Sequence, residues 1–440
     1  MKVLFNIALF LIYSPFLISQ SDLPFKIEIE KLAIDSLPAL QSYAWAKSGT
    51  KILLVGGRTD GLHKRQPFAS FNKQFNNTNL IVWDVELNKI WKLSVNEFPN
   101  SIAEQLQSSN MEFYQDGNIL WLVGGYGYSE SKKTHRTYPS IIGIKVEELI
   151  HSIVSGSKSD SFIAQIEDTR MAVTGGRMHK HNGKLYLVGG QRFDGRYNPH
   201  GPDHGPGFLQ EYTNEIRMFN ITWTNNNIQI INYTAKKNDD LLHRRDYNLL
   251  PQIDRDGKEM LTIFSGVFRY DKDLPYTSLI DIKNEEPAEV NNFSQKFCHY
   301  HTANLSMHSR FDRSQYSVFF GGIAQFTPGD KDSILSDENV PFVKTISVIK
   351  RNSSGTIEYS LPQSMNGFFG SAAEFIPYNN ASFSKFGILE LDKLTTNKTL
   401  VGYIIGGIGS TEPNVFWSNT PENNFAAPYI WKVYLSNTSK

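Results

Sequence analysis

Arginine, aspartate and aromatic side chains recur in polar segments that directly follow apolar runs ending in glycine. The segment RTDGLHKRQPF begins at Arg58 and carries Asp60 and His63, and the segment QRFDGRYN carries Arg192 and Asp194. Arginine presents a planar fork of donors that fits carboxylates and phosphates, and aromatic rings stack on planar groups and sugar rings. These residue types predict a site for a small polar or anionic ligand, with an acidic saccharide favoured.

The ligand-binding candidates come from these segments and from the segments that lead into the next repeat. A protein partner at the same face is the other interpretation, and the alternative role for each arginine is an architectural ion pair with Asp60, Asp194, Asp246 or Glu211. The predicted ligand-binding residues are Arg58, Asp60, Asn110, Tyr126, Tyr128, Arg192, Asp194, Arg244, Arg245, Tyr300 and His301.

Catalysis is left open by the sequence, with a binding protein preferred. Asp60, Asp246 and His301 are the candidates for a general acid or base near a bound sugar, and no motif selects among them. The chain has neither a nucleophile-elbow pattern nor a phosphate-binding GxxxxGK[ST] loop. A carboxylate and a histidine facing each other would favour an enzyme, whereas an arginine and aromatic floor would favour binding.

One histidine-rich loop is a candidate metal site. HGPDHGPG supplies His200, Asp203 and His204, and imidazole suits zinc or copper. A closed site needs more ligands than these three, and glycine with proline also makes an ordinary stiff loop. We therefore predict no cofactor and keep a divalent metal at this loop as the alternative.

Six repeats must position these side chains. Each repeat has an apolar run, an upstream turn such as HNGK or RDGK, and further strand-like runs such as residues 79–93. Asn-Gly and Asp-Gly favour hairpin turns, so each repeat is predicted to be a four-stranded antiparallel sheet. Six such sheets arranged radially bury their faces against one another, as in a β-propeller. The apolar runs end at Gly57, Gly125, Gly190, Gly266, Gly322 and Gly407.

The repeats resemble kelch repeats, in which the second strand ends in Gly-Gly and later strands carry aromatic residues. Trp83, Asp84 and Trp91 match the later part of that pattern, and the fourth repeat has Ser265 before its glycine. The resemblance covers residues 25–436 and implies an all-β, six-bladed kelch-type β-propeller. We expect the glycines to serve the fold through close backbone approach.

Enzymes with a similar architecture suggest two alternative functions. Resemblance to secreted kelch-type mutarotases acting on sialic acid implies a sugar isomerase. Resemblance to copper radical oxidases of the galactose oxidase type rests on the pair Tyr300 and His301. Here Cys298 adjoins that pair, and a second tyrosine ligand is not identifiable, so the oxidase ranks below the isomerase.

The N-terminus predicts export and ring closure. Residues 1–21 resemble a signal peptide, with cleavage expected after Ser19 or Ser21, and residues 22–440 form the predicted propeller. The alternating run FKIEIEKLA, residues 25–33, is expected to complete the last blade. Lys plus Arg equals Asp plus Glu at 44 each, which argues against nucleic-acid binding. We expect a secreted or periplasmic monomer without a transmembrane anchor.

Overall fold

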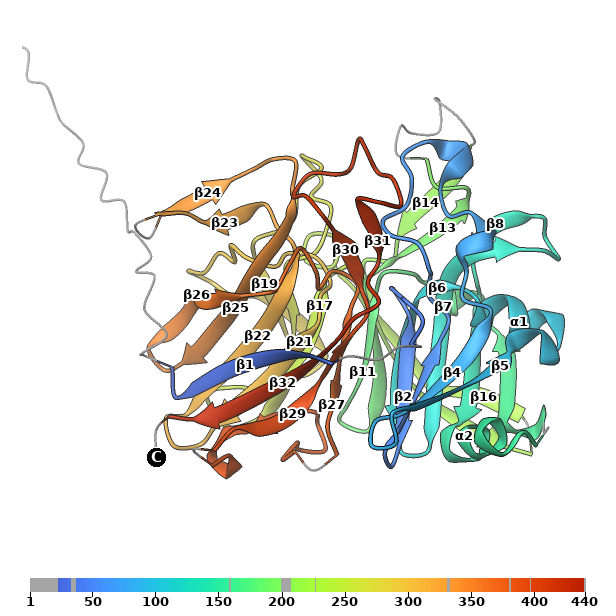
Figure 1. The fold of residues 1–440 in the computed structure, drawn as a ribbon, viewed down its shortest axis with the longest axis horizontal. Helices are drawn as coiled ribbons and strands as arrows, with labels where there is room; N and C mark the ends of the chain where they lie inside the picture. The colour runs from blue at the N-terminus through green and yellow to red at the C-terminus, as the bar shows by residue number, and fades with distance from the viewer. Residues whose placement is uncertain are drawn as a thin grey trace, which may run out of the picture.

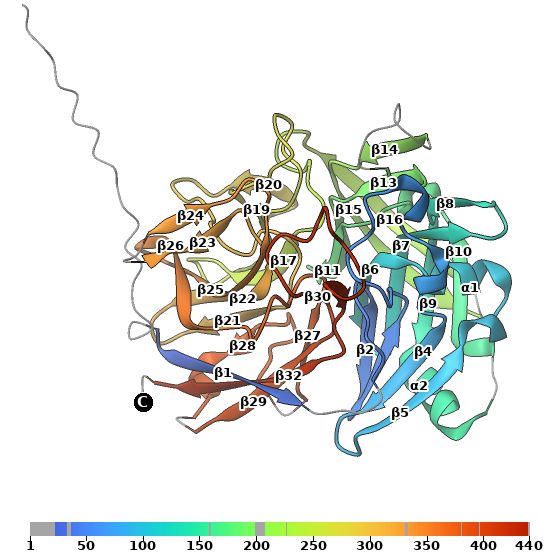
Figure 2. The same ribbon diagram turned by 45° about the horizontal axis from the view of Figure 1, so that its top comes forward.

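The computed structural model is an all-β propeller with six blades around a central axis (Figures 1 and 2). It describes residues 23–32, 37–157, 160–198, 207–225, 227–330, 333–379, 381–395 and 397–438. The predicted signal peptide lies outside these residues. The predicted fold class is therefore confirmed for the propeller itself.

Each blade is built on four antiparallel strands that follow one another outward from the axis, and in blade 5 the short strand β28 (Leu389–Glu390) also pairs in parallel with the innermost strand. The innermost strands are β2 (Ala44–Ser48), β6 (Ser109–Asp116), β11 (Arg177–His181), β17 (Asn248–Ile253), β21 (Asn304–Ser309) and β27 (Glu374–Pro377). The second strands are β3 (Lys51–Val55), β7 (Ile119–Ser129), β12 (Lys184–Val188), β18 (Glu259–Phe264), β22 (Ser314–Ile323) and β29 (Thr399–Ile405).

The two outer positions of each blade are filled in the same order. The third strands are β4 (Asn79–Asp84), β9 (Ser140–Lys145), β15 (Glu215–Thr224), β19 (Leu279–Lys283), β25 (Phe342–Asn352) and β32 (Ile430–Asn437). The outermost strands are β5 (Lys89–Ser94), β10 (Ile163–Glu167), β16 (Asn227–Lys237), β20 (Glu286–Glu289), β26 (Gly355–Ser364) and β1 (Phe25–Leu32).

The N-terminal strand closes the ring, as the sequence predicted. Strand β1 pairs antiparallel with β32 in blade 6, from Phe25 opposite Asn437 to Leu32 opposite Ile430 (Figure 1). The first and last strands of the described chain therefore share one sheet, and β32 has no open edge there.

Hydrophobic clusters fill the six interfaces between neighbouring blades. In β3, Leu53 and Val55 pack against blade 2, whereas Ile52 and Leu54 pack against blade 6. Alternate side chains of a strand point to opposite faces of its sheet, and both faces of each blade are covered. This explains why the second strands are continuous apolar runs.

Several elements were not predicted from the repeat pattern. Two helices, α1 (Asn100–Leu106) and α2 (Val146–Ser155), lie near blades 1 and 2. Four of the loops that follow the second strands form additional hairpins. The strands of these hairpins are β8 (Thr134–Thr137) with the end of β7, β13 (Gln191–Gly195) with β14 (Phe208–Tyr212), β23 (Phe326–Pro328) with β24 (Ile334–Ser336), and β30 (Ile408–Ser410) with β31 (Asn424–Ala426).

Candidate functional site

The glycine that ends each second strand binds the backbone of the next blade. Its N–H donates to a carbonyl in the segment that leads into the next innermost strand, here called the lead-in loop. The bonds join Gly57 to Ser108 (2.9 Å), Gly125 to Val173 (2.9 Å), Gly190 to Arg244 (2.8 Å), Gly266 to His299 (3.2 Å), Gly322 to Phe369 (2.9 Å) and Gly407 to Leu40 (2.8 Å). The repeated glycines therefore connect the blades, which confirms their predicted structural role.

Glycine is required here for two physical reasons. Gly124 and Gly125 have φ of 64° and 85°, in the left-handed region that favours glycine. A Cβ on Gly124 would lie 1.9 Å from the carbonyl oxygen of Val173. In blade 4 Ser265 takes the first position at φ 57° and donates its hydroxyl to Tyr276 O at 2.5 Å.

A second ring of backbone hydrogen bonds closes around the axis itself, one residue per blade. Five of the six residues have positive φ, which is unfavourable for the four that are not glycine. The bonds run from Ser42 N to Ala372 O (3.1 Å), Ala372 N to His301 O (3.0 Å), His301 N to Asp246 O (2.7 Å), Asp246 N to Gly175 O (2.7 Å), Gly175 N to Asn110 O (3.5 Å) and Asn110 N to Ser42 O (3.0 Å). We call this the axial ring, and the loops around it the axial mouth.

A polar cluster joins the innermost strands near the axial ring. Arg177 of blade 3 lies 3.5 Å from Glu374 of blade 6, and His301 Nε2 lies 3.1 Å from the same Glu374 oxygen. Burial opposes the charge of Glu374, but His301 and Arg177 together lower its pKa below the usual value. Burial and the charge of Arg177 lower the pKa of His301, and the carboxylate of Glu374 opposes that shift. The side chain of His301 is therefore engaged with Glu374.

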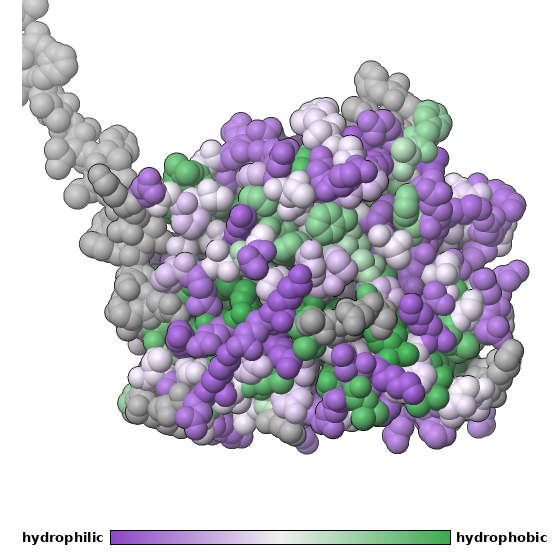
Figure 3. All heavy atoms as spheres, viewed as in Figure 1, coloured by the Kyte–Doolittle hydropathy of each residue, from purple (hydrophilic) through white to green (hydrophobic). Residues whose placement is uncertain are grey.

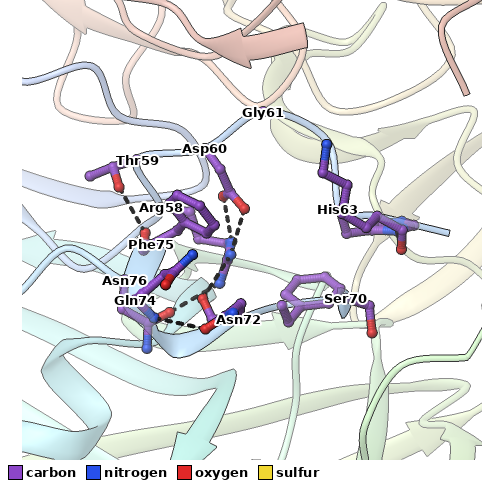
Figure 4. Close-up of polar contacts among 12 residues, drawn as sticks. Arg58, Thr59, Asp60, Gly61, His63, Ser70, Asn72, Gln74, Phe75 and Asn76 are labelled. Atoms are coloured by element: carbon purple, nitrogen blue, oxygen red, sulfur yellow. Dashed lines mark hydrogen bonds and ion pairs between the residues drawn. The ribbon is translucent and has the colours of Figure 1, made fainter. Parts of the chain in front are cut away.

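Blade 1 contributes an ion pair to the mouth (Figure 4). Arg58 Nε and Nη2 donate to the carboxylate of Asp60 at 2.8 and 2.7 Å, and Arg58 Nη1 donates to Asn76 Oδ1 at 3.0 Å. The Arg58 side chain is 3% exposed and the Asp60 side chain 21%. The guanidinium of Arg58 is thus hydrogen-bonded within its own loop, and the carboxylate of Asp60 is the group that reaches solvent.

Blade 4 contributes a second pair of the same kind. Arg245 Nη1 donates to Asp246 Oδ2 at 2.6 Å, and Arg245 Nε donates to Tyr212 OH at 3.1 Å. Burial opposes the charge of Arg245, but Tyr212 and Asp246 outweigh it and raise the pKa. Phe268 lies under the guanidinium at 5.0 Å. Asp246 keeps a side chain that is 23% exposed, so it too presents a carboxylate to solvent.

Aromatic side chains from other blades surround this second pair. The charges of Arg245 and Asp246 act on Tyr197 of the blade 3 loop and on Tyr300 of the blade 5 lead-in loop. The ring of His63, from blade 1, lies 4.5 Å from that of Tyr197. Burial lowers the pKa of His63 to about 4, and Arg245 and Asp246 both act on it. Residues of blades 1, 3 and 5 therefore converge on the Arg245 pair of blade 4.

The loops of the mouth are fastened to one another. Tyr126 OH donates to Gly195 O at 2.7 Å and accepts from Tyr197 N at 3.1 Å. Ser70 Oγ donates to Tyr197 O at 2.5 Å. The mouth is therefore a preorganised scaffold, and Tyr126, which is 5% exposed, connects its loops from within.

The structure separates the predicted ligand-binding residues into groups. His301 faces Glu374, and five others lie at the axial mouth. These five are Arg58, Asp60, Asn110, Arg245 and Tyr300. Arg244 is 2% exposed and donates to the carbonyl oxygens of Leu241, Ser265 and Ser278 and to Ser278 Oγ. The donors of Arg244 are therefore bonded within the protein, and its contact with a ligand stays a prediction.

The remaining predicted residues lie on outer hairpins. Arg192 pairs with Asp194 at 2.6 Å, and the Arg192 side chain is 46% exposed. Tyr128 lines a shallow cavity of about 260 Å³ with Lys73 and Glu130. These three predicted residues therefore sit at the rim and not in the polar cluster around the axis.

Neither a metal site nor a membrane span is found in the described part of the chain. No three His, Cys, Asp or Glu side chains among those residues lie close enough to hold a metal ion. The candidates His200, Asp203 and His204 lie outside the described residues and stay a prediction. Among the described helices, none combines the length and the apolar character needed to cross a membrane.

Sequence reasoning missed some of the charged and aromatic residues near the axis. Arg177 and Glu374 each begin an innermost strand, and Glu112 occupies the middle of another. The available signal was a charged residue within or beside a strand otherwise expected to be buried. Tyr212 gave no comparable signal, because it ends the short hairpin strand β14 within a polar segment of the sequence.

Comparison with known proteins supports the fold alone. No protein-family model matches the chain, and no curated protein matches it. Among solved structures, that of YjhT is similar, with a TM-score of 0.50 and 10% sequence identity over 90% of this chain and 95% of that chain. At this identity the similarity establishes a shared propeller fold and no shared activity.

Proposed function

We propose that this protein is an exported, kelch-type propeller that binds a small polyhydroxylated ligand, a saccharide, at the axial mouth. The observation that carries the proposal is the pair of partly exposed carboxylates, Asp60 and Asp246, held by Arg58 and Arg245, whose side chains are only 3% and 12% exposed. Carboxylates accept hydrogen bonds from sugar hydroxyls, and a fixed carboxylate loses little entropy on binding. The nearby rings of Tyr197 and Tyr300 would supply apolar surface for a sugar ring.

The pairing of the arginines changes the preferred ligand. Arg58 and Arg245 already donate to Asp60 and Asp246, so an incoming anion would have to compete with a carboxylate. A neutral saccharide only needs acceptors and donors at fixed positions. We therefore favour a neutral sugar over the acidic sugar suggested by the arginine content of the sequence.

Thermal melts and calorimetry with single sugars test this proposal. The panel contains glucose, galactose and N-acetylglucosamine as neutral sugars, and glucuronate and N-acetylneuraminate as acidic ones. A ligand at 100 times its Kd raises the stability of the folded state by about 2.7 kcal/mol, which gives a measurable shift in Tm. We expect at least one neutral sugar to raise the Tm and Asp246→Asn to weaken its binding about tenfold.

The matched control is Asp168→Asn. Asp168 also pairs with an arginine, Arg170, at 2.5 Å, but Arg170 lies over the ring of Tyr233 on the outermost strand β16. Sugar binding should be unchanged in this control. If no sugar binds, the saccharide proposal fails and a protein partner at this face takes its place. If only acidic sugars bind, the preference for a neutral ligand is wrong.

A sugar isomerase is the second candidate, and His63 is the observation that favours it. His63 is neutral at neutral pH and close enough to Asp246 for that charge to act on its pKa. A neutral imidazole and a carboxylate could move the proton of an anomeric hydroxyl during ring opening. NMR of freshly dissolved sugar anomers would detect faster mutarotation. Loss of that acceleration in His63→Gln, with sugar binding retained, would distinguish catalysis from binding.

The export part of the proposal rests on residues 1–21 and has its own test. Expression with the native N-terminus, followed by N-terminal sequencing of the mature protein, should give a chain beginning after Ser19 or Ser21. Retention of Met1 in the folded product would contradict export by a cleaved signal peptide.

A further inference from the structure

A cavity of about 590 Å³ lies at the junction of blades 5 and 6, apart from the polar cluster of the axial mouth. Its size is that of cavities that bind small organic molecules. The wall comprises hairpin β23 and β24, the start of β25, the end of β26, and loop residues of blade 6. The lining residues on which the inference depends are Leu335, Asp337, Phe342, Lys344, Leu361 and Phe368.

The wall of this cavity is largely apolar. Phe342 and Leu361 are buried, at 1% and 7% exposure, and form its inner side. Leu335, on the facing hairpin strand β24, is 58% exposed and lies opposite this buried apolar surface. Figure 3 shows one face of the molecule, on which hydrophobic residues form patches among hydrophilic ones. A ligand with an apolar body would cover Leu335.

The two charged residues of the cavity differ in their availability. Asp337 Oδ1 accepts from Asn339 N at 2.9 Å and Asn339 Nδ2 at 2.8 Å, and Asp337 Oδ2 accepts from Asn414 Nδ2 at 3.1 Å. The hydrogen bond from Asn339 N lowers the pKa of Asp337, so it is an anion. Three of the roughly four acceptor sites of its carboxylate are taken within the protein.

Lys344 carries the charge of the cavity that a ligand can contact. Its Nζ lies 4.5 Å from the ring centroid of Phe368, and it is exposed. Within the described residues, Lys344 makes no ion pair with a carboxylate. Contact with the ring face orients the ammonium group over an apolar surface. Its three donors are thus directed by the protein but lack a partner anion.

We propose that this cavity binds a small amphipathic carboxylate, with its carboxylate on Lys344 and its apolar body against Leu335, Phe342 and Leu361. This combination places the anion of the ligand on an ammonium that makes no ion pair within the described residues, and it covers the exposed leucine. The proposal is independent of the saccharide site, because it uses none of the residues of the axial mouth.

Isothermal titration with 2-naphthoate and its neutral analogue 2-naphthamide tests the proposal on the full mature chain. We expect saturable binding of 2-naphthoate and a loss of at least fivefold in affinity in Lys344→Gln. The same variant should leave the affinity for 2-naphthamide unchanged, because the amide carries no charge. Leu335→Ser should weaken both probes, because the apolar contact is shared.

The matched control is Lys89→Gln. Lys89 is also exposed, with its Nζ 5.0 Å from the ring of Trp91, but it lines neither described cavity. Unchanged affinity in this variant is expected. The proposal is overturned if 2-naphthoate does not bind saturably, if Lys344→Gln binds it as well as the parent protein, or if Asp246→Asn abolishes its binding.

Discussion

Arg177 of blade 3 and Glu374 of blade 6 pair with each other across the axis, with Nη1 and Oε1 3.5 Å apart. Blades 3 and 6 stand opposite each other in a ring of six, so this contact joins strands that are distant both in sequence and around the ring. His301 of blade 5 contacts the same carboxylate oxygen at 3.1 Å. The pair is an internal brace near the floor of the axial mouth.

Glu374→Gln should destabilise the protein, because it leaves Arg177 without a counter-charge. Loss of one partner of a buried pair costs about 3 to 5 kcal/mol, and the partial exposure of Arg177 reduces the expected loss to about 2 to 3 kcal/mol. The lowered pKa of Glu374 means that its contribution is present above about pH 4.5 and is lost as pH falls through the folded-state pKa. Denaturant unfolding should show the two proteins converging in acid. The surface variant Glu28→Gln should lose less than about 1 kcal/mol.

Glu112 makes the opposite contribution to the pH dependence of stability. Its Oε1 accepts from Gly176 N at 2.8 Å, its Oε2 is buried and has no hydrogen-bond partner among the described residues, and burial raises its pKa to about 8. The folded protein keeps this proton between about pH 4.5 and pH 8, whereas the unfolded chain releases it, so stability falls as pH rises.

Glu112→Gln removes that proton linkage and should flatten the curve. Relative to the parent protein, the variant should gain stability between pH 4.5 and pH 8, by about 1.4 kcal/mol for each unit by which the folded-state pKa is raised. Denaturant midpoints measured at intervals across this range provide the test. Parallel curves for the two proteins would show that Glu112 has an ordinary pKa.

Sequence reasoning predicted the ring because the repeated pattern is local. Each run such as KILLV is apolar at successive positions, and the glycine after it marks the contact with the next blade. The closing strand at residues 25–32 was also predictable, because it alternates and has no partner in blade 1. These features depend on backbone geometry and burial, which leave a periodic trace in sequence.

The site was predicted only in part, because side-chain pairing across loops leaves no such trace. Arg58 and Arg244 are the same residue type in the sequence. In the structure, Arg58 donates to a carboxylate at the mouth, whereas Arg244 is enclosed by carbonyl oxygens. The convergence of Tyr197, Tyr212 and Tyr300 depends on loops from two blades, and spacing along the chain does not encode it. Arg177 and Glu374 could not be paired for the same reason.

Gly124→Ala should be far more destabilising than Gly183→Ala, although both glycines have positive φ. At Gly183, with φ 76°, no atom of the described residues lies within 4 Å of the position that an alanine methyl group would occupy, so alanine there incurs only the backbone strain of about 1 to 2 kcal/mol. At Gly124 the methyl would also meet Val173 O at 1.9 Å, and the expected loss is at least about 3 kcal/mol. Equal losses in denaturant unfolding would show that close backbone approach between blades is not what selects glycine.

Ile27→Ala should weaken the ring at its closure. Ile27 lies on β1, is fully buried between blades 5 and 6, and belongs to the same cluster as Val433 of β32. Truncating a buried isoleucine costs about 2 to 5 kcal/mol, because it removes contacts and leaves a cavity. Lys26→Ala on the same strand removes an exposed side chain and should change the free energy of unfolding by less than about 0.5 kcal/mol. Guanidinium unfolding of both variants measures the difference. If Ile27→Ala were as stable as Lys26→Ala, pairing of β1 would contribute little to closure, and the ring would have to be held by the backbone bonds between blades.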